Sequence, residues 1–167
     1  MLLSKLAKEI YKQHYLHLWY PGGAEWYMEQ YAYATDKIEK EIANPATEYY
    51  IVTVHGIPAG YIKLNLFAIL PGEEEADKME VERIYLHTTS KGKGLGKQLM
   101  LLALQRAKEL QKEIIFLKAM DSATDAIAFY KSLGYTICDS FQLPLPDFEL
   151  MKKEYRGMVV LKRKVLL

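Results

Sequence analysis

Glycines and lysines alternate in one short segment that could hold an anion. The segment follows a predicted strand and opens a predicted helix, and it reads Lys91, Gly92, Lys93, Gly94, Leu95, Gly96 and Lys97. Amides at the start of a helix have no partner inside the helix, and the positive end of the helix dipole favours negative charge there. Glycine lets the backbone approach a phosphate closely, and the lysines add positive charge. The segment therefore predicts a pyrophosphate-binding loop.

Two common nucleotide-binding motifs do not fit this loop. A Walker loop has four residues between its first glycine and Gly-Lys, and then Ser or Thr, whereas Gln98 follows Lys97. The Rossmann fingerprint is G-x-G-x-x-G, whereas the spacing here is G-x-G-x-G. A single glycine loop also arises by chance at the start of a charged surface helix. A second, independent motif is needed to decide between the two interpretations.

Two carboxylates and a phenol could move protons. Glu80 and Glu82 alternate along the strand before the loop, which predicts that they share one face with Ile84 and Leu86. A carboxylate can accept a proton, and the phenol of Tyr130 can donate one. The alternative is that the carboxylates are solvated or structural and that Tyr130 is a core residue on an apolar helix face.

Two separated motifs together resemble the GNAT superfamily of N-acetyltransferases. In that family the cofactor loop begins with Arg or Gln and continues with two residues, Gly, one residue, and Gly or Ala; residues 91–96 match this frame, with Lys91 in first place. The second family mark is a Tyr followed by Gly and an aromatic residue, which residues 126–135 match with Tyr130, Gly134 and Tyr135. The resemblance runs from Leu2 onward and is greatest to PaiA-type polyamine acetyltransferases.

The resemblance implies acetyl-CoA as co-substrate and no metal. It places the pyrophosphate on residues 91–97 and the pantetheine arm on the backbone of the preceding strand. The other cofactor contacts that it implies are Ile84, Tyr85, Leu86, Ser122, Phe129 and Tyr130. The family often has Asn seven residues before the Tyr, where this chain has Ala123. Asp121 or Ser122 could substitute, although Ser122 with Asp125 also reads as a helix-capping pair.

The resemblance also implies a mechanism. An alkylamine is neutral in only about one molecule in a thousand at pH 7, so a base that removes its proton is useful. Glu80 and Glu82 each match the base position of some family members, and Tyr130 matches the general acid. The acceptor expected first is a polyamine; the alternatives are a protein N-terminus, a lysine side chain or another small amine. A catalytically silent CoA-binding or regulatory module is the hypothesis from another class.

An acidic loop precedes the strand that carries the two carboxylates. It contains Glu73, Glu74, Glu75 and Asp77. Such a loop would attract a cationic acceptor if it bordered the acceptor site, and otherwise it is simply solvated. Both interpretations stay open.

Periodicity and turn residues predict the elements that must position these groups. Helices are expected at 3–18, 25–34, 35–43, 95–111 and 122–133, and strands at 49–54, 59–67, 79–87, 113–119, 135–142 and 155–165. This order predicts an α/β fold with a mixed sheet and flanking helices in one domain, 1–167. Compared with the GNAT fold that the resemblance implies, the usual first strand is missing.

Composition excludes several classes of protein. The 167 residues carry a net charge of +1 and contain one cysteine, Cys138, so neither nucleic acid nor an internal disulfide is expected. No apolar run approaches the roughly 20 residues that cross a bilayer. The four histidines lack metal-ligand spacing apart from a weak pair, His14 and His17. The thirteen tyrosines suit strands or a pocket that needs phenolic donors. We expect a cytoplasmic protein with a small-molecule amine acceptor, no membrane partner, and a possible homodimer.

Overall fold

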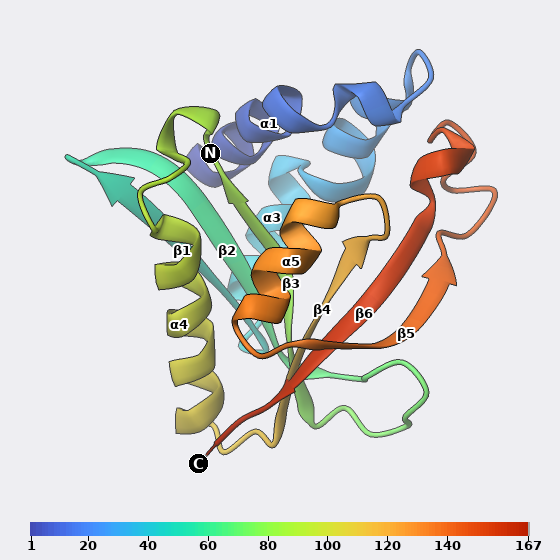
Figure 1. Ribbon diagram of the computed structural model, residues 1–167. Coiled ribbons are helices and arrows are strands. Elements are labelled where there is room, and N and C mark those ends of the chain that lie inside the picture. The colour runs from blue at the N-terminus through green and yellow to red at the C-terminus, as the bar shows by residue number, and fades with distance from the viewer. Residues whose placement is uncertain (167) are drawn as a thin grey trace.

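The computed structural model describes residues 1–166, which form a six-stranded mixed sheet in the order β1-β2-β3-β4-β6-β5 (Figure 1). All neighbouring strands are antiparallel except β3 and β4, which run parallel. The strands are β1 (Thr47–Val54), β2 (Ile57–Ala68), β3 (Lys78–Leu86), β4 (Ile114–Met120), β5 (Thr136–Gln142) and β6 (Gly157–Lys164). The predicted mixed sheet is confirmed.

Helices cover both faces of the sheet. One face carries α4 and α5, which pack with the sheet around Leu64, Val81 and Leu117. The other face carries the N-terminal helices, which form a second core around Tyr11, Tyr33 and Tyr61. The helices are α1 (Leu2–His14), α2 (Gly23–Trp26), α3 (Thr35–Ala43), α4 (Leu95–Glu109) and α5 (Thr124–Ser132). Short 3-10 turns are η1 (Leu16–Leu18), η3 (Thr88–Ser90) and η4 (Lys153–Tyr155).

The second predicted helix differs from expectation. Residues 25–34 were expected to be one α-helix, but α2 passes into a π-helical segment, η2 (Tyr27–Ala32). The wider turn stacks the rings of Tyr27 and Tyr31, whose centroids are 5.5 Å apart. Periodicity alone does not distinguish a π-helical turn from an α-helical one.

Strands β3 and β4 separate soon after they meet. They pair at Met79–Ile115, Glu80–Phe116 and Val81–Leu117, and beyond that point no pairing between them is found in residues 1–166. On its other edge β3 keeps pairing with β2 up to Leu86. The second half of β3 therefore lacks a strand partner on its β4 side within the described chain.

A β-bulge lies where the two strands separate. Lys63 pairs with Arg83 and Leu64 pairs with Val81, so Glu82 is the extra residue on β3. The prediction that Glu82 shares a face with Ile84 is therefore wrong. Glu82 contacts Lys63 and Asn65, whereas Ile84 packs in the core beneath α4. An inserted residue breaks the two-residue alternation on which the prediction depended.

In residues 1–166 the first element is α1, which begins at Leu2. Within the same residues, no helix is both long and apolar enough to cross a membrane.

Candidate active site

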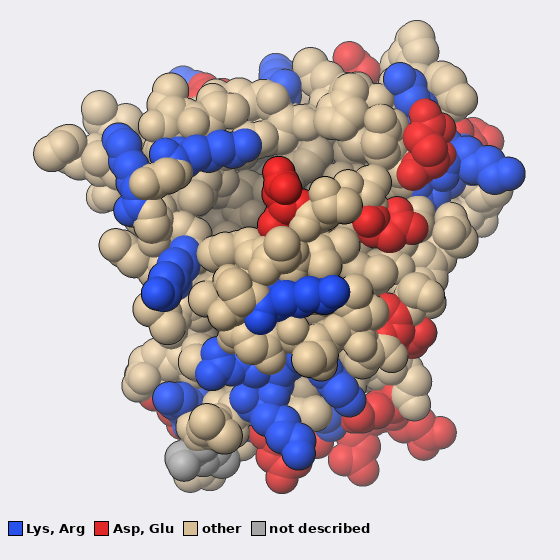
Figure 2. All heavy atoms as spheres, in the orientation of Figure 1, with Lys and Arg blue, Asp and Glu red and all other residues tan. Residues whose placement is uncertain are grey.

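A cavity of about 390 Å³ lies where β3 and β4 separate. The sheet and α5 contribute Val81, Glu82, Arg83, Ile84, Tyr85, Leu117, Lys118, Ala119, Met120, Ala123, Ala126 and Tyr130. The opposite wall comes from the N-terminal helices and the segment around β6, with Tyr11, Tyr15, Leu18, Tyr27, Tyr31, Leu143, Phe148, Met151 and Met158. Figure 2 shows a hollow in the face that carries α4 and α5. Residues from both cores thus meet in one space.

The predicted glycine loop leads into a helix start whose backbone amides have no partner inside the helix. Gly92 and Gly94 have φ values of 77° and 73°, a conformation that glycine adopts without strain. Gly94 caps α4 without a side-chain hydrogen bond, and the first bond inside the helix runs from Gln98 N to Gly94 O at 3.1 Å. The amides of residues 95–97 are therefore left for a ligand. Lys and Arg side chains gather over the start of α4 beside the hollow (Figure 2).

The other residues of the loop and of the strand before it divide into two groups. Leu95 is buried, so only its backbone could contact a ligand. Ile84 and Tyr85 line the cavity, whereas Leu86 lies just outside it, near Gly96 and Phe129. The structure therefore brings the unpaired edge of β3 close to the start of α4.

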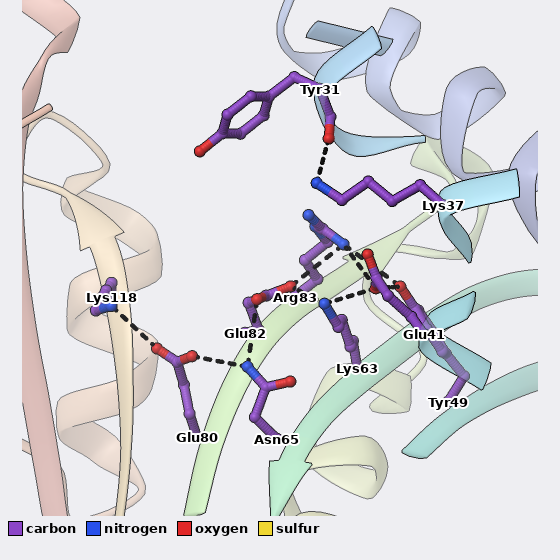
Figure 3. Close-up of polar contacts among 10 residues, drawn as sticks. All are labelled: Tyr31, Lys37, Glu41, Tyr49, Lys63, Asn65, Glu80, Glu82, Arg83 and Lys118. Carbon is purple, nitrogen blue, oxygen red and sulfur yellow. Dashed lines mark hydrogen bonds and ion pairs between the residues drawn. The ribbon is translucent and has the colours of Figure 1, made fainter. Parts of the chain in front are cut away.

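Glu82 and Glu80 have different surroundings. Glu82 lines the cavity, whereas Glu80 does not. Glu80 is buried, accepts a hydrogen bond from Asn65 at 3.0 Å, and lies 3.3 Å from Lys118 Nζ (Figure 3). Of the two predicted bases, only Glu82 faces the space where a substrate could bind.

Glu82 belongs to a buried cluster of alternating charges (Figure 3). Lys63 Nζ lies 2.5 Å from Glu82 Oε2 and 2.6 Å from Glu41 Oε2, and only 6% of the Lys63 side chain is exposed. Arg83 Nη1 lies 3.2 Å from Glu82 and 3.8 Å from Glu41. Two cations and two carboxylates therefore balance one another.

This cluster determines the ionisation of Glu82. Burial acts to raise the pKa of Glu82, but the charges of Arg83 and Lys63 and the hydrogen bonds from Lys63 and Asn65 together lower the pKa below its ordinary value. Glu82 is therefore a carboxylate at neutral pH.

Tyr130 also faces the cavity, from the side of α5. Its ring lies 5.4 Å from that of Phe129 and 6.4 Å from that of Tyr135. Burial, with a smaller contribution from Tyr135, raises the pKa of Tyr130 to about 12. Its hydroxyl makes no hydrogen bond to another residue of the described chain and remains protonated at neutral pH.

The start of α5 differs from expectation. The helix begins at Thr124 rather than Ser122, and its N-cap, Ala123, has no side-chain capping bond, so the predicted capping pair of Ser122 and Asp125 is wrong. Ser122 does not line the cavity, whereas Ala123 and Ala126 do. Small side chains at these two positions keep this part of the wall open.

Sequence reasoning missed Arg83, Lys118 and the wall phenols of Tyr11, Tyr15 and Tyr31. Arg83 directly follows Glu82, and the bulge turns both side chains toward the same polar side of the sheet. Only the pairing register shows this, because strict alternation would have placed them on opposite faces. The sequence offers an aromatic set, Trp19, Tyr20, Trp26 and Tyr27, as one possible lining of an acceptor pocket, and of these four the cavity wall includes Tyr27.

The acidic loop lies away from this site. It precedes the start of β3, whereas the cavity lies at the end of β3, and acidic side chains gather over the loop at the lower right of Figure 2. Glu73 and Asp77 pair with Lys78 at the base of the strand. The loop therefore belongs to a solvated surface. Residues 1–166 contain no group of three or more His, Cys, Asp or Glu arranged to hold a metal ion.

The family model for GNAT acetyltransferases matches residues 8–135. The chain belongs to this family. A GNAT relative, an uncharacterized N-acetyltransferase of Lactobacillus delbrueckii subsp. lactis (pepI 3' region), is 37% identical over 101 residues, which cover 60% of the chain and 58% of the relative. Another, YjgM of Escherichia coli K12, also an uncharacterized N-acetyltransferase, is 30% identical over 104 residues, covering 62% of the chain and 60% of the relative. The match thus spans about three-fifths of these relatives.

Solved GNAT structures confirm the predicted fold. A PaiA N-acetyltransferase from Thermoplasma acidophilum in complex with coenzyme A superposes with a TM-score of 0.72 at 19% identity, covering 97% of this chain and 90% of that one. The protein smu.2055 from Streptococcus mutans UA159 also gives a TM-score of 0.72, at 14% identity, with coverages of 98% and 94%. At these identities the likeness concerns the fold.

Replacing Gly94 with alanine should weaken CoA binding. A side chain at this φ costs about 1–2 kcal/mol, and relief of that strain moves the amides that follow. We expect a roughly tenfold loss of CoA affinity by calorimetry. Gly56 is a matched control, because it has a φ of 78°, equally open surroundings and a place in the β1–β2 turn. Equal loss of CoA affinity in Gly94→Ala and Gly56→Ala would contradict the assignment of the loop.

Replacing Lys63 with methionine should destabilise the fold in a pH-dependent way. The change removes one of the two cations that Glu41 and Glu82 share. The cost should approach about 3 kcal/mol of unfolding free energy at pH 7, the lower end for breaking a buried pair, because Arg83 remains and the Glu82 side chain is 33% exposed. Glu82 has a lowered pKa, so its stabilisation is present above its ordinary pKa of 4.5 and is lost as the pH falls through the lowered value. The deficit of the variant, measured by urea unfolding, should therefore shrink from pH 7 to pH 4.

The control for this measurement is Lys8→Met. Lys8 forms an ion pair with Glu29 at 2.7 Å on the surface. Its loss should cost less than about 1 kcal/mol, because water screens exposed pairs. Similar losses for Lys63→Met and Lys8→Met would show that the buried cluster contributes no more than a surface pair.

Proposed function

We propose that the chain is an N-acetyltransferase that moves an acetyl group from acetyl-CoA to a primary amine in the cavity. The observation that carries the proposal is the meeting of Glu82, Tyr130 and the unpaired edge of β3 in one space. A carboxylate, a protonated phenol and a free strand edge are the groups that such a transfer requires.

Acetyl-CoA fits the residues that surround this space. The amides at the start of α4, with Lys91, Lys93 and Lys97, would hold the pyrophosphate. The free edge of β3 at residues 84–86 would pair with the amides of the pantetheine arm as a strand does. Phe129 lies beside Gly96 and would flank the arm. The co-substrate supplies an acetyl group activated as a thioester.

Glu82 acts as the base. As an ionised carboxylate beside the cavity, it takes the proton of the acceptor ammonium, directly or through water. Its low pKa makes it a weak base, so passage of the proton through water to solvent suits it. The neutral nitrogen then bonds to the thioester carbon, and it releases a second proton through water to solvent as the amide forms and the carbon–sulfur bond breaks.

Tyr130 acts as the acid. As the carbon–sulfur bond breaks, the phenol gives its proton to the departing sulfur, and solvent later restores that proton. Because the pKa of Tyr130 is about 12, the phenol is protonated at every pH at which the protein would work. Cavity walls from both cores limit the access of water.

Polyamines are the acceptor class expected from the sequence. The structural likeness to a PaiA N-acetyltransferase supports this expectation at the level of fold. The acidic loop, at the other end of β3, gives it no support. A protein N-terminus or lysine is the alternative. A cytoplasmic location and a homodimer through a sheet edge are further proposals that rest on the sequence.

A CoA titration by calorimetry, followed by thiol release with candidate amines, tests the proposal as a whole. Binding followed by thiol release is the expected result. Binding without release, across a broad amine panel, would favour the silent CoA-binding module. Failure to bind CoA would overturn the assignment of the cofactor site.

Tyr130→Phe should slow turnover by about a hundredfold, because it removes the proton donor and leaves the ring in place. CoA affinity should stay within about twofold, since the phenol is needed only as sulfur departs. Tyr135→Phe is the matched control, a neighbouring buried tyrosine whose pKa burial also raises to about 12. An unchanged kcat in Tyr130→Phe would remove the acid role from this residue.

Glu82→Gln should lower kcat by about a hundredfold or more, whereas Glu80→Gln should have a much smaller effect. The two changes remove the same charge, and only Glu82 lines the cavity. Steady-state kinetics at saturating acetyl-CoA measures both. A larger effect at Glu80 would transfer the base role to that residue.

A further inference from the structure

The charges that face the cavity do not suit a polycation. Three charged side chains of the described chain line it, and two of them, Arg83 and Lys118, are cations. The third, Glu82, is already contacted by Lys63 at 2.5 Å and by Arg83 at 3.2 Å. A second ammonium group of an acceptor would find two cations and no carboxylate without a partner.

Arg83 has a second edge inside the site, which no carboxylate contacts and which interacts with the hydroxyl of Tyr27. Only 9% of the residue is exposed, and the contacts to Glu82, Glu41 and Tyr49 are all made by Nη1. Figure 3 draws the other terminal nitrogen on the side of Lys37 and Tyr31, away from these contacts. A guanidinium edge presents parallel N–H groups, which match the two oxygens of a carboxylate.

Further donors surround the same space. Tyr27 and Tyr31 line the cavity, and burial raises the pKa of both, so their hydroxyls stay protonated and can donate. Lys118 Nζ lies 3.3 Å from Glu80, and its side chain remains 39% exposed. Lys37 contacts the carbonyl of Tyr31 from α3 (Figure 3). Asp147, whose charge contributes to the raised pKa of Tyr31, is exposed and does not line the cavity.

The remaining wall is aromatic and apolar. Tyr11 and Tyr27 stack at 4.8 Å, and Phe148 meets Tyr31 edge-on at 5.3 Å. Such a wall favours an apolar or aromatic group on the acceptor. Because the cavity of about 390 Å³ must also admit the thioester, the acceptor itself must be small.

We propose that the acceptor is an amino acid with an apolar or aromatic side chain, whose amine lies toward Glu82 and whose carboxylate is held by Arg83. This assignment rests on the proposed acetyl transfer and names its substrate class. Glu82 and Arg83 are consecutive residues whose side chains contact each other, so the groups that they bind must be close together, as the amine and carboxylate of an α-amino acid are. The bond that forms is the amide N–C bond of an N-acetylamino acid, and CoA leaves with the proton from Tyr130.

The test compares three amines with the same phenyl side chain that differ at the carboxylate, together with spermidine as the polyamine. Thiol release from acetyl-CoA is followed with phenylalanine, phenylalaninamide, phenethylamine and spermidine. We expect phenylalanine to exceed phenethylamine in kcat/KM by roughly tenfold to a hundredfold, the range for losing a hydrogen-bonded charge. Phenylalaninamide controls for the basicity of the amine, because it lacks the carboxylate and its amine is neutral more readily than that of phenylalanine. The comparison uses the unaltered protein and needs no variant to fold.

Arg83→Lys is the matched variant, because it keeps the charge and removes the paired N–H groups. The ratio of kcat/KM for phenylalanine to that for phenethylamine should fall toward unity in the variant, while CoA affinity changes little. Because Arg83 also contacts Glu82, turnover of both amines can fall, and the ratio cancels that common loss. Equal or better use of phenethylamine or spermidine by the unaltered protein would overturn the assignment and leave the acetyltransferase intact.

A binding measurement separates failure of this assignment from failure of the proposed function. If no amine releases thiol, the acetyltransferase proposal falls, and N-acetylphenylalanine and N-acetylphenethylamine are titrated into the CoA complex. Tighter binding of the carboxylate compound would uphold the anion site on Arg83. Equal binding would overturn that site as well.

Discussion

Parallel pairing between β3 and β4 stops after three residue pairs, and the candidate site depends on this early separation. A strand that kept its partner would fill the space where the cavity lies and would use the backbone groups of residues 84–86. The bulge at Glu82 marks the point of separation, since a bulge bends a strand and disrupts its ladder. Glycine at the start of α4 and small residues at the start of α5 keep the opening clear.

The charged cluster around Glu82 holds the bulge of β3 in one arrangement. The side chain of Glu82, the bulged residue, forms ion pairs with Lys63 and Arg83. Each of these two cations also contacts Glu41 from α3. Removing one member of such a cluster leaves an uncompensated charge in a nearly dry place, whereas the complete cluster costs little. The cluster therefore ties the bulge to a helix more than forty residues earlier and keeps Glu82 ionised.

Much of the fold follows from sequence patterns, and the site follows only in part. The glycine loop, the long helix after it and Tyr130 each depend on local spacing, and the structure places them as expected. The bulge at Glu82 inserts one residue into the two-residue alternation of β3. The predicted sheet face of every side chain after it on that strand was therefore wrong. Tyr27 and Tyr31 lie on a π-helical turn, and Arg83 gains its role through register with β2. These features depend on tertiary pairing, which a local pattern does not encode.

The two cores touch the cavity from different sides. The layer of α4 and α5 borders the cofactor loop, while the N-terminal helices and the segment around Phe148 form the opposite wall. Changes in separate clusters tend to add without interfering. Under the proposed acetyl transfer, substitutions among the wall tyrosines would therefore change which amine is accepted and leave the cofactor side unchanged, so that acceptor choice could evolve separately from cofactor binding.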